Sequence, residues 1–292
     1  MWWVGAGLQP ALEQDYRALR LTEQAMTETS YIIKGGDSGA DRLRILGEAT
    51  WPSTERLLNK LHISSGMHSL DFGCGGGDVS VKLAQLVGPS GSVTGIDMDS
   101  TVLERARGLA LENNVSVEFL EKHCEEFDEQ NRYDVAYARF ILSHLTDPHD
   151  ALRRMKESVK PGGWVVAEDI DIASHLYYPD NEAVARYVNI YEESARYRGA
   201  DPNIGPKLVS IFVEGGIRDP EVNVVMPTFR AGPGKSIARI TLRNIADTAI
   251  EAGITTREEV DDLLEELSRF EADPTSIIST AQIIQVWGRR PT

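Results

Sequence analysis

The stretch LDFGCGGGD, Leu70–Asp78, decides the fold of this chain. It joins a short strand candidate, Met67–Asp71, to a helix candidate, Asp78–Val87. Glycines at such a junction let the backbone turn sharply and approach a ligand without a side chain in between. In parallel sheets this junction, at the carboxyl end of the first strand, is where nucleotide-like ligands bind. The stretch therefore predicts a ligand-binding loop in an α/β protein.

Outward from the loop, strand and helix candidates alternate along the chain. Further strands are expected at Ser92–Ile96, Val115–Leu120, Tyr133–Ala138, Trp164–Ile170, Glu221–Val225 and Ala281–Gly288. Further helices are expected at Ser100–Glu112, Asp147–Val159, Asn181–Gly199, Ser236–Gly253 and Thr256–Phe270. Strands that alternate with helices of this length indicate βαβ units and a doubly wound parallel sheet.

The flanks of this pattern predict additions to the sheet. Helices that are broken by the glycines of Lys34–Gly39 and restarted at Trp51 precede it. The amphipathic stretch after the fifth strand is longer than a crossover requires and predicts a cap. The expected organisation is a helical N-terminal lid (1–62), a ligand-binding core (63–175), a helical cap insertion (176–218) and a C-terminal completion of the sheet with additional helices (219–292).

Acidic residues around the loop indicate which ligand it binds. Asp97 ends the second strand, about 20 residues past the glycines, where a carboxylate can accept hydrogen bonds from the hydroxyls of an adenosine ribose. NAD-binding proteins share that acid. Asp71 just before the loop and Asp78 just after it would instead repel a pyrophosphate and attract a cation. The acids therefore favour S-adenosylmethionine, which carries an ammonium and a sulfonium group, over NAD.

Composition narrows the choice of partners. The 292 residues include 30 basic and 45 acidic side chains, so the net charge is −15. Nucleic-acid binding depends on lysines and arginines that neutralise phosphates, so we expect no nucleic-acid partner. No apolar stretch reaches the roughly 20 residues of a membrane span, and two cysteines cannot form a disulfide framework. We expect a cytoplasmic protein without a membrane partner, and no metal site because no cluster has ligand spacing.

Four blocks of the sequence resemble the class I S-adenosylmethionine-dependent methyltransferases, in that family's order and spacing. They are LDFGCGGGD (Leu70–Asp78), TGIDMD (Thr94–Asp99), RYDVAYARFILSHL (Arg132–Leu145) and VKPGGWVVAED (Val159–Asp169). The resemblance implies a Rossmann-like, seven-stranded and mostly parallel sheet whose last strand, Ala281–Gly288, is antiparallel. It also implies a small-molecule type of enzyme and, at the level of the family, a homodimer.

The same resemblance implies a set of cofactor contacts. Asp71 and the glycines of the loop would line the cofactor, Asp97 would hold the ribose hydroxyls, and Met98 would lie against the adenine. After the third strand, His123 stands where the family often has an acid beside the adenine. The adenine contact would then come from His123, from its neighbour Cys124 or from a backbone group. The glycines concerned are Gly73, Gly75 and Gly77.

Two arginines and a tyrosine are further candidates for the cofactor site. Arg42 resembles the arginine of a lid helix in similar enzymes, where it could reach the cofactor carboxylate as a bidentate pair. Tyr31 belongs to the same lid. As an alternative, Arg42 is a solvated helix charge. Arg139 either faces the cofactor pocket or pairs with Asp169.

Candidate catalytic and substrate-binding groups follow the fourth and fifth strands. His144 lies near the expected methyl donor and could be a general base, or it could only pack in an apolar turn. Asp169 and Asp171 share one side of their strand and could accept a proton or bind a substrate, or both could be surface acids. The next residues, His175, Tyr177 and Tyr178, are expected on a loop over the site.

Together these features predict methyl transfer from S-adenosylmethionine to a small-molecule acceptor. An O, N, S or carbon nucleophile would attack in line and release S-adenosylhomocysteine. Two alternatives remain open at this stage. One is a protein that binds S-adenosylmethionine without methylating, and the other is a methyltransferase that acts on proteins.

Overall fold

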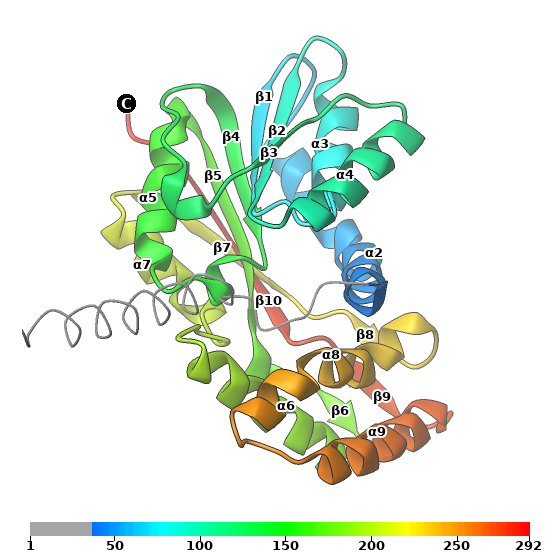
Figure 1. Ribbon diagram of the computed structural model, residues 1–292. Helices are drawn as coiled ribbons and strands as arrows, with labels where there is room; N and C mark the ends of the chain where they lie inside the picture. Colours follow the sequence, from blue (N-terminus) through cyan, green and yellow to red (C-terminus); the bar gives the residue numbers. More distant parts are fainter. Residues whose placement is uncertain (1–36) are drawn as a thin grey trace, which may run out of the picture.

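A seven-stranded sheet organises the larger lobe of the computed structural model, which describes residues 37–292 (Figure 1). The strand order is β3-β2-β1-β4-β5-β10-β7. Ladders between β1, β2, β3, β4 and β5 are parallel, whereas β10 runs antiparallel to both β5 and β7. The predicted mostly parallel α/β sheet with an antiparallel last strand is confirmed. The strands are β1 (His68–Phe72), β2 (Ser92–Asp97), β3 (Glu118–Glu121), β4 (Tyr133–Arg139), β5 (Val159–Asp171), β7 (Glu221–Val225) and β10 (Gln282–Arg289).

Helices cover both faces of this sheet because its strands carry apolar side chains on both sides. In β4, Ala136 and Ala138 join the buried cluster under α5 and α7, while Val135 and Tyr137 join the cluster under α2 and α3. α4 closes a smaller cluster beside α3. These helices are α2 (Asp37–Lys60), α3 (Asp78–Val87), α4 (Ser100–Glu112), α5 (Pro148–Ser158) and α7 (Leu208–Glu214). None of the helices between residues 37 and 292 combines the length and apolar character that crossing a bilayer requires.

The lid helix α2 is continuous, and the expected restart at Trp51 is wrong. Pro52 lies inside the helix and removes the hydrogen bond to the carbonyl of Glu48. Both Pro52 and Glu48 are exposed, so water can serve that carbonyl. Farther along the helix, Leu58 and its apolar neighbours are buried against the sheet and hold this end of α2 in place. Within the described residues, the predicted lid is therefore one long helix that begins at Asp37.

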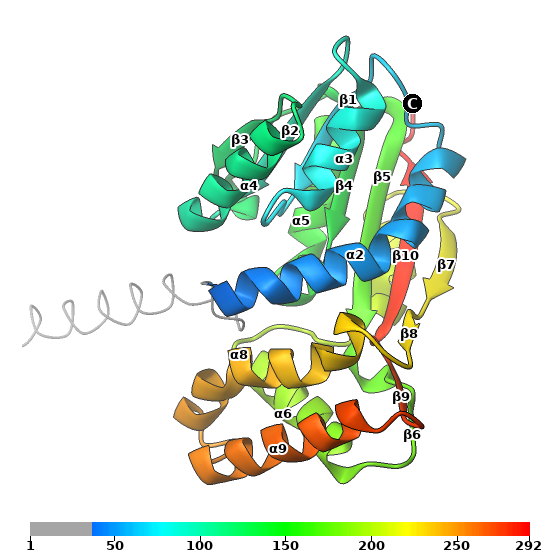
Figure 2. The ribbon, with the colours of Figure 1, turned by 90° about the vertical axis from the view of Figure 1, so that its right-hand side faces the viewer.

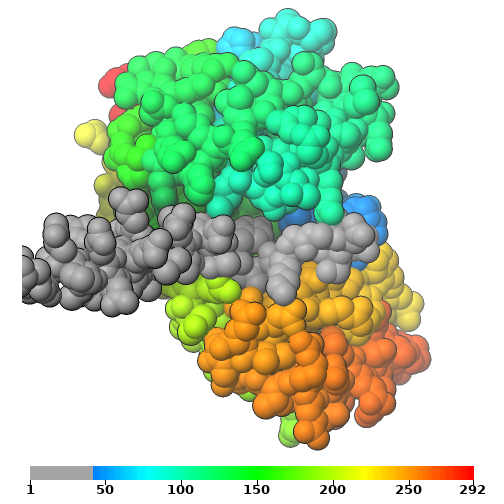
Figure 3. Space-filling view, in the orientation of Figure 1, coloured from blue at the N-terminus to red at the C-terminus, as the bar shows by residue number. Residues whose placement is uncertain are grey.

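The second lobe is a helical cap with its own core, and it lies below the sheet lobe in the view of Figures 1 and 3 and again in Figure 2. Helices α6, α8 and α9 pack against one another and bury a cluster that also takes in Ile172 and Ile278. A small antiparallel sheet of order β6-β9-β8 borders it. The elements of the cap are α6 (Glu182–Tyr197), α8 (Ile237–Glu251), α9 (Arg257–Ala272), β6 (Tyr177–Tyr178), β8 (Thr228–Phe229) and β9 (Ile277–Ser279).

The cap is assembled differently from the expected insertion of residues 176–218. Only α6 of that segment lies in the cap core, because Leu208, Ile211 and Phe212 of α7 are buried against the main sheet. The other two cap helices, α8 and α9, come from residues 219–292. Amphipathic periodicity predicts that a helix has a buried face but not which lobe covers it.

Short 3₁₀ turns complete the path of the chain. The most relevant is η2 (Leu142–His144), directly after β4, and the others are η1 (Cys124–Glu126), η3 (Ile172–Ser174), η4 (Gly205–Lys207) and η5 (Pro233–Ser236).

Candidate functional site

Three glycines of the loop after β1 are predicted cofactor contacts. Two of them are tightly packed against neighbouring side chains, and the third borders open space. A Cβ atom on Gly73 would lie 2.6 Å from Ile141 Cγ1, and one on Gly77 would lie 2.8 Å from Ala106 Cβ. A Cβ atom on Gly75 would meet nothing within 4 Å. All three have positive φ, which glycine adopts without strain. The fold therefore needs Gly73 and Gly77, while Gly75 borders open space that a ligand can use.

Asp97, at the carboxyl end of β2, is held in place by two backbone amides. Gly75 N donates to its Oδ2 at 2.9 Å and Asp99 N donates to its Oδ1 at 3.0 Å. Burial raises the pKa of Asp97, and these amides oppose that rise. Each carboxylate oxygen keeps a lone pair for a further donor, as binding to two ribose hydroxyls requires. Its neighbour Met98 is 38% exposed, at the place expected to face an adenine.

Asp71 lies buried under the loop. Ser80 Oγ donates to its Oδ2 at 2.5 Å. Burial raises the pKa of Asp71 to about 7, and Asp78 and Asp97 add to the effect. Burial and the two carboxylates Asp71 and Asp97 also raise the pKa of the Cys74 thiol well above its usual range, so this thiol is not an activated nucleophile. The loop thus concentrates negative charge that a cationic ligand would stabilise.

Asp78 and Arg139 form an ion pair with each other. Arg139 also donates to Thr50 Oγ1 of α2 at 3.1 Å. The expected alternative, a pair between Arg139 and Asp169, is wrong. The pair also removes Asp78 from the charges available to a ligand, so the attraction for a cation rests on Asp71 and Asp97.

Glu168 is a buried carboxylate for which the sequence predicted no role. Its carboxylate accepts from Thr54 Oγ1 at 3.1 Å and from Tyr137 Oη at 2.9 Å. Burial raises the pKa of Glu168, and the charge of Arg139 opposes that rise. Glu168 therefore joins α2, β4 and β5 beneath the loop. The available signal was a carboxylate that directly follows the apolar run Trp164–Ala167.

The turn after β3 carries the two candidates for the adenine contact. His123 is exposed and begins η1, while Cys124 is partly buried and packs at the edge of the main core. Burial raises the pKa of the Cys124 thiol to about 12, and the charge of Asp97 contributes to the rise. The adenine contact stays a prediction for both residues.

Asp169 holds the turn that follows β4. Its Oδ2 accepts from Ser143 N at 3.0 Å and its Oδ1 from Ile170 N at 2.9 Å. Burial raises the pKa of Asp169 to about 6. Because both oxygens serve backbone amides, this carboxylate positions η2 and the buried His144. Burial, together with the charge of Arg42, lowers the pKa of His144 from 6.5 to about 4, so its imidazole stays neutral even in mildly acidic solution.

Arg42 is buried, which excludes the alternative of a solvated helix charge. Its Nε donates to Thr241 Oγ1 of α8 at 3.0 Å. Its charge acts on His144 and on Tyr187 and Tyr191 of α6. Arg42 thus faces the cap side of the molecule. Tyr31, the other predicted lid contact, lies outside the described residues.

The predicted substrate residues after β5 lie in or beside the small sheet. His175 Nδ1 contacts the carbonyl of Ile172 at 2.8 Å, and its ring packs edge to face on Tyr187. Tyr177 and Tyr178 form β6, and Tyr178 is 67% exposed. Asp171 is half-buried at the end of β5, where burial raises its pKa. Their roles as substrate contacts stay predictions, and His175 contacts the cap helix α6 through Tyr187.

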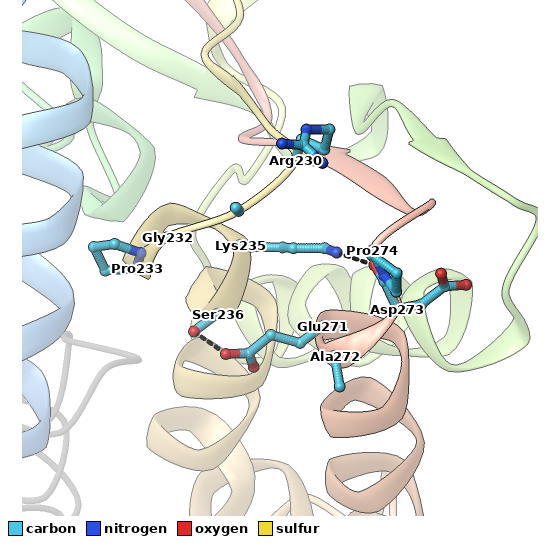
Figure 4. Close-up of a pocket in the computed structure, with 10 residues that line it drawn as sticks. Arg230, Gly232, Pro233, Lys235, Ser236, Glu271, Ala272, Asp273 and Pro274 are labelled. Carbon is cyan, nitrogen blue, oxygen red and sulfur yellow. Dashed lines mark hydrogen bonds between the residues drawn. The ribbon is translucent and has the colours of Figure 1, made fainter.

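A separate pocket of about 540 Å³ lies in the cap between η5 and the end of α9 (Figure 4). Three of the polar side chains that line it, Lys235, Ser236 and Glu271, have partners within the cap. The buried Lys235 Nζ donates to the carbonyl of Asp273 at 2.6 Å, and Ser236 Oγ donates to Glu271. Glu271 also pairs with Arg239. These contacts join α8 to α9, so the residues of this pocket stabilise the cap.

Comparisons with known proteins agree with this geometry. A family of sequences described as a methyltransferase domain matches residues 63–216, more than half of the chain. The ubiquinone/menaquinone biosynthesis C-methyltransferase UbiE of Hahella chejuensis is 27% identical over 188 residues, which cover 62% of this chain and 72% of that protein. A ubiquinone biosynthesis O-methyltransferase of Bordetella avium is 39% identical over 102 residues, covering 34% of this chain and 41% of that protein, so the match spans less than half of its length.

The fold has solved counterparts as well. The structure of the Bacillus halodurans protein BH2331 superimposes with a TM-score of 0.57 at 19% identity, over 82% of this chain and 98% of that one. At this identity the likeness concerns the fold alone. With the family match and the loop geometry, it leads to one conclusion: the chain belongs to the class I S-adenosylmethionine-dependent methyltransferases.

Proposed function

We propose that this protein transfers a methyl group from S-adenosylmethionine to a small-molecule acceptor between the carboxyl edge of the main sheet and the cap. The observation that supports this most strongly is the buried polar cluster at that junction. Arg42, His144, Tyr187, Tyr191 and Thr241 are at most 9% exposed. Polar groups that converge in an enclosed place are typical of small-molecule sites. A long polymer would need an open groove instead.

The residues of the loop fit the cofactor. Gly75 leaves open space, the fixed carboxylate of Asp97 can accept two ribose hydroxyls, and Asp71 and Asp97 together favour a positively charged ligand. A neutral or anionic nucleotide would not relieve the repulsion between these two carboxylates. When bound, S-adenosylmethionine supplies an already activated methyl group, so the protein need only bind, orient and shield the two reactants.

The chain's own residues would perform that positioning. The pair of Arg139 with Asp78 and its bond to Thr50 join the lid helix to the loop. Asp169 fixes the turn η2 and with it His144, which faces the cap. His144 stays neutral at pH 7 and is a weak proton acceptor, because its pKa lies near 4. Holding the partners in line can supply about 7–11 kcal/mol of the acceleration.

The curated relatives also favour a small acceptor. The names of the two reported above describe methyltransferases of ubiquinone or menaquinone biosynthesis, and ubiquinone is a small molecule. The net charge of −15 argues against a polyanionic nucleic acid. A homodimer and a cytoplasmic location remain predictions.

Methyl transfer from a labelled donor tests the proposal. The full chain is incubated with S-adenosylmethionine labelled in its methyl group and with separate panels of small hydroxyl, amine, thiol and activated-carbon acceptors, of proteins, and of nucleic acids. We expect label in members of the small-molecule panel only. Label in proteins alone would favour a protein-directed enzyme, and binding of the donor without transfer to any panel would favour a non-methylating binder. Either result would contradict the proposal.

A further inference from the structure

A buried cluster of polar side chains lies where the lid helix meets the cap. Arg42 comes from α2, Tyr187 and Tyr191 from α6, and Thr241 from α8, while His144 lies in η2 at the edge of the main sheet. Helix α8 packs against both α2 and α6. Figure 2 shows α2 crossing between the sheet and α8. The cluster therefore lies at the junction of three parts of the fold, on the acceptor side of the proposed site.

The charge of this cluster is not balanced by the described residues. The Arg42 guanidinium has five N–H donors, and its one hydrogen bond within residues 42–292, whose side chains the structure describes, is the 3.0 Å contact to Thr241. No carboxylate in that range forms an ion pair with it. The nearby Asp169 accepts from Ser143 N and Ile170 N and forms no ion pair with Arg42. A buried guanidinium is costly unless an anion accompanies it, so the site favours a negatively charged ligand group.

The neighbours of Arg42 add donors rather than acceptors for such a group. A phenol keeps its proton at neutral pH, and burial raises the pKa of Tyr187 and of Tyr191 further, so both hydroxyls can donate. No hydrogen bond of the Tyr191 hydroxyl to another described residue is present. The rings of the two tyrosines also offer apolar surface beside the charge. An acid group attached to an aromatic or apolar body would match both properties.

Two arginines divide the site between cofactor and acceptor. Arg139 pairs with Asp78 and acts on Asp71 beneath the glycine loop. Arg42 instead bonds to the cap at Thr241 and acts on His144, Tyr187 and Tyr191. The donors of Arg42 are thus placed among cap residues rather than among the loop residues that would contact the cofactor.

We propose that Arg42, with Tyr187 and Tyr191, binds an anionic group of the methyl acceptor, a carboxylate or a phosphate monoester. This inference rests on the proposed function, since it assigns the acceptor class of the same site. The other possible source of a carboxylate is the methionine part of the cofactor, and the experiment separates the two.

The test measures binding of small aromatic anions to the full chain saturated with S-adenosylhomocysteine. The probes are benzoate and phenyl phosphate, with benzamide as the uncharged comparison, titrated by calorimetry or ligand-observed NMR. The variants are Arg42→Gln and, as a matched control on the same helix, Arg44→Gln, whose side chain is exposed and pairs with Glu48 at 2.9 Å. Thermal unfolding of each variant confirms that it is folded before titration.

We expect at least one anion to bind the wild-type complex more tightly than benzamide. Arg42→Gln should weaken that binding about tenfold or more, since it removes charge-assisted hydrogen bonds, while Arg44→Gln should leave it unchanged. Thr241→Val, which frees the guanidinium from its one described partner, should alter anion affinity without affecting S-adenosylhomocysteine. Failure of both anions to bind, or equal binding by wild type and Arg42→Gln, would overturn the inference.

A second titration identifies the source of the carboxylate. S-adenosylhomocysteine and 5′-methylthioadenosine, which lacks the amino-acid portion, are compared on wild type and Arg42→Gln. We expect both to bind Arg42→Gln nearly as well as wild type. A loss of about tenfold for S-adenosylhomocysteine alone would assign Arg42 to the cofactor carboxylate and contradict the inference. If wild type binds neither nucleoside, the proposed function itself fails, which is a different result from failure of the anion probes.

Discussion

The glycine loop and the cap differ in how their parts are distributed along the chain. The loop site, from Asp71 to Asp97, is built from two consecutive strands and the turns at their carboxyl ends. The cap site combines Arg42, Tyr191 and Thr241. About 150 residues separate the first two along the chain, and about 50 separate the last two. They differ in charge as well, because the loop is acidic and the cap cluster holds a cation. Local sequence therefore predicts cofactor chemistry well, whereas acceptor chemistry depends on tertiary packing.

The largest expected effect distinguishes the two arginines by their structural roles. Arg139→Met breaks the pair with Asp78, removes the bond to Thr50 and leaves the buried Glu168 without its neighbouring cation. We expect a loss in the free energy of unfolding on the order of 3 kcal/mol. Arg42→Met removes a buried charge that forms no ion pair with the described residues, so we expect little loss or a gain in stability. Urea unfolding measures both.

A surface pair provides the control for these two variants. Arg153→Met, which breaks an exposed pair with Asp150, should change the unfolding free energy by less than about 1 kcal/mol. If Arg42→Met destabilised the protein as much as Arg139→Met, the distinction between a structural and a ligand-binding arginine would be wrong.

Asp97→Ala tests the loop side alone. The substitution removes two charge-assisted hydrogen bonds to the ribose, each worth about 1.5–3 kcal/mol. The dissociation constant for S-adenosylhomocysteine should rise about a hundredfold or more. Glu121→Ala, at the exposed end of the neighbouring strand and in register with Asp97, is the control. An equal effect of the two substitutions would mean that the ribose does not lie at Asp97.

The smallest expected effect is a pH dependence of cofactor affinity. The pKa of Asp71 is raised to about 7 in the folded protein. Between about pH 4 and pH 7 the carboxyl is therefore protonated in the folded protein but ionised in the unfolded chain. Asp71 therefore destabilises the folded state as pH rises from about 4 to 7. A cationic ligand favours the ionised form, so affinity for S-adenosylmethionine should increase by up to about tenfold between pH 6 and pH 8.

Two comparisons control this pH effect. S-adenosylhomocysteine lacks the sulfonium charge and should show a smaller increase, and Asp71→Asn should show almost none. The measurement is a series of calorimetric titrations at pH 6, 7 and 8. The same rise in Asp71→Asn as in wild type would assign the titration to another group.

The contrast between the regions also explains what could be predicted from the sequence. The helix bounds Asp78–Val87 and Ser100–Glu112 and the strand Glu221–Val225 agree with the structure, because glycine turns and apolar periodicity mark them locally. The seven-stranded, mostly parallel sheet with an antiparallel last strand followed from the resemblance and is confirmed. Strands β6, β8 and β9 were missed because two or three residues are too short to show a period.

Errors in the site have a common physical cause. Asp169, in the next strand, was one expected partner of Arg139. Its carboxylate instead accepts from the backbone of η2, and Arg139 pairs with Asp78 at the start of α3. Periodicity likewise could not show that α8 and α9 join α6 in the cap. Contacts between side chains from distant segments leave no mark in a local pattern, and the carboxylate of Glu168 directly after an apolar run was the one visible clue.

The most direct test of the central claim is a calorimetric titration of the wild-type chain with S-adenosylhomocysteine, with NAD as the control ligand. We predict binding in the micromolar range for S-adenosylhomocysteine and none for NAD, because Asp71 and Asp97 favour a positively charged ligand group and repel a pyrophosphate. Binding of NAD, or no binding of S-adenosylhomocysteine, would contradict the assignment of the loop and with it the proposed methyl transfer.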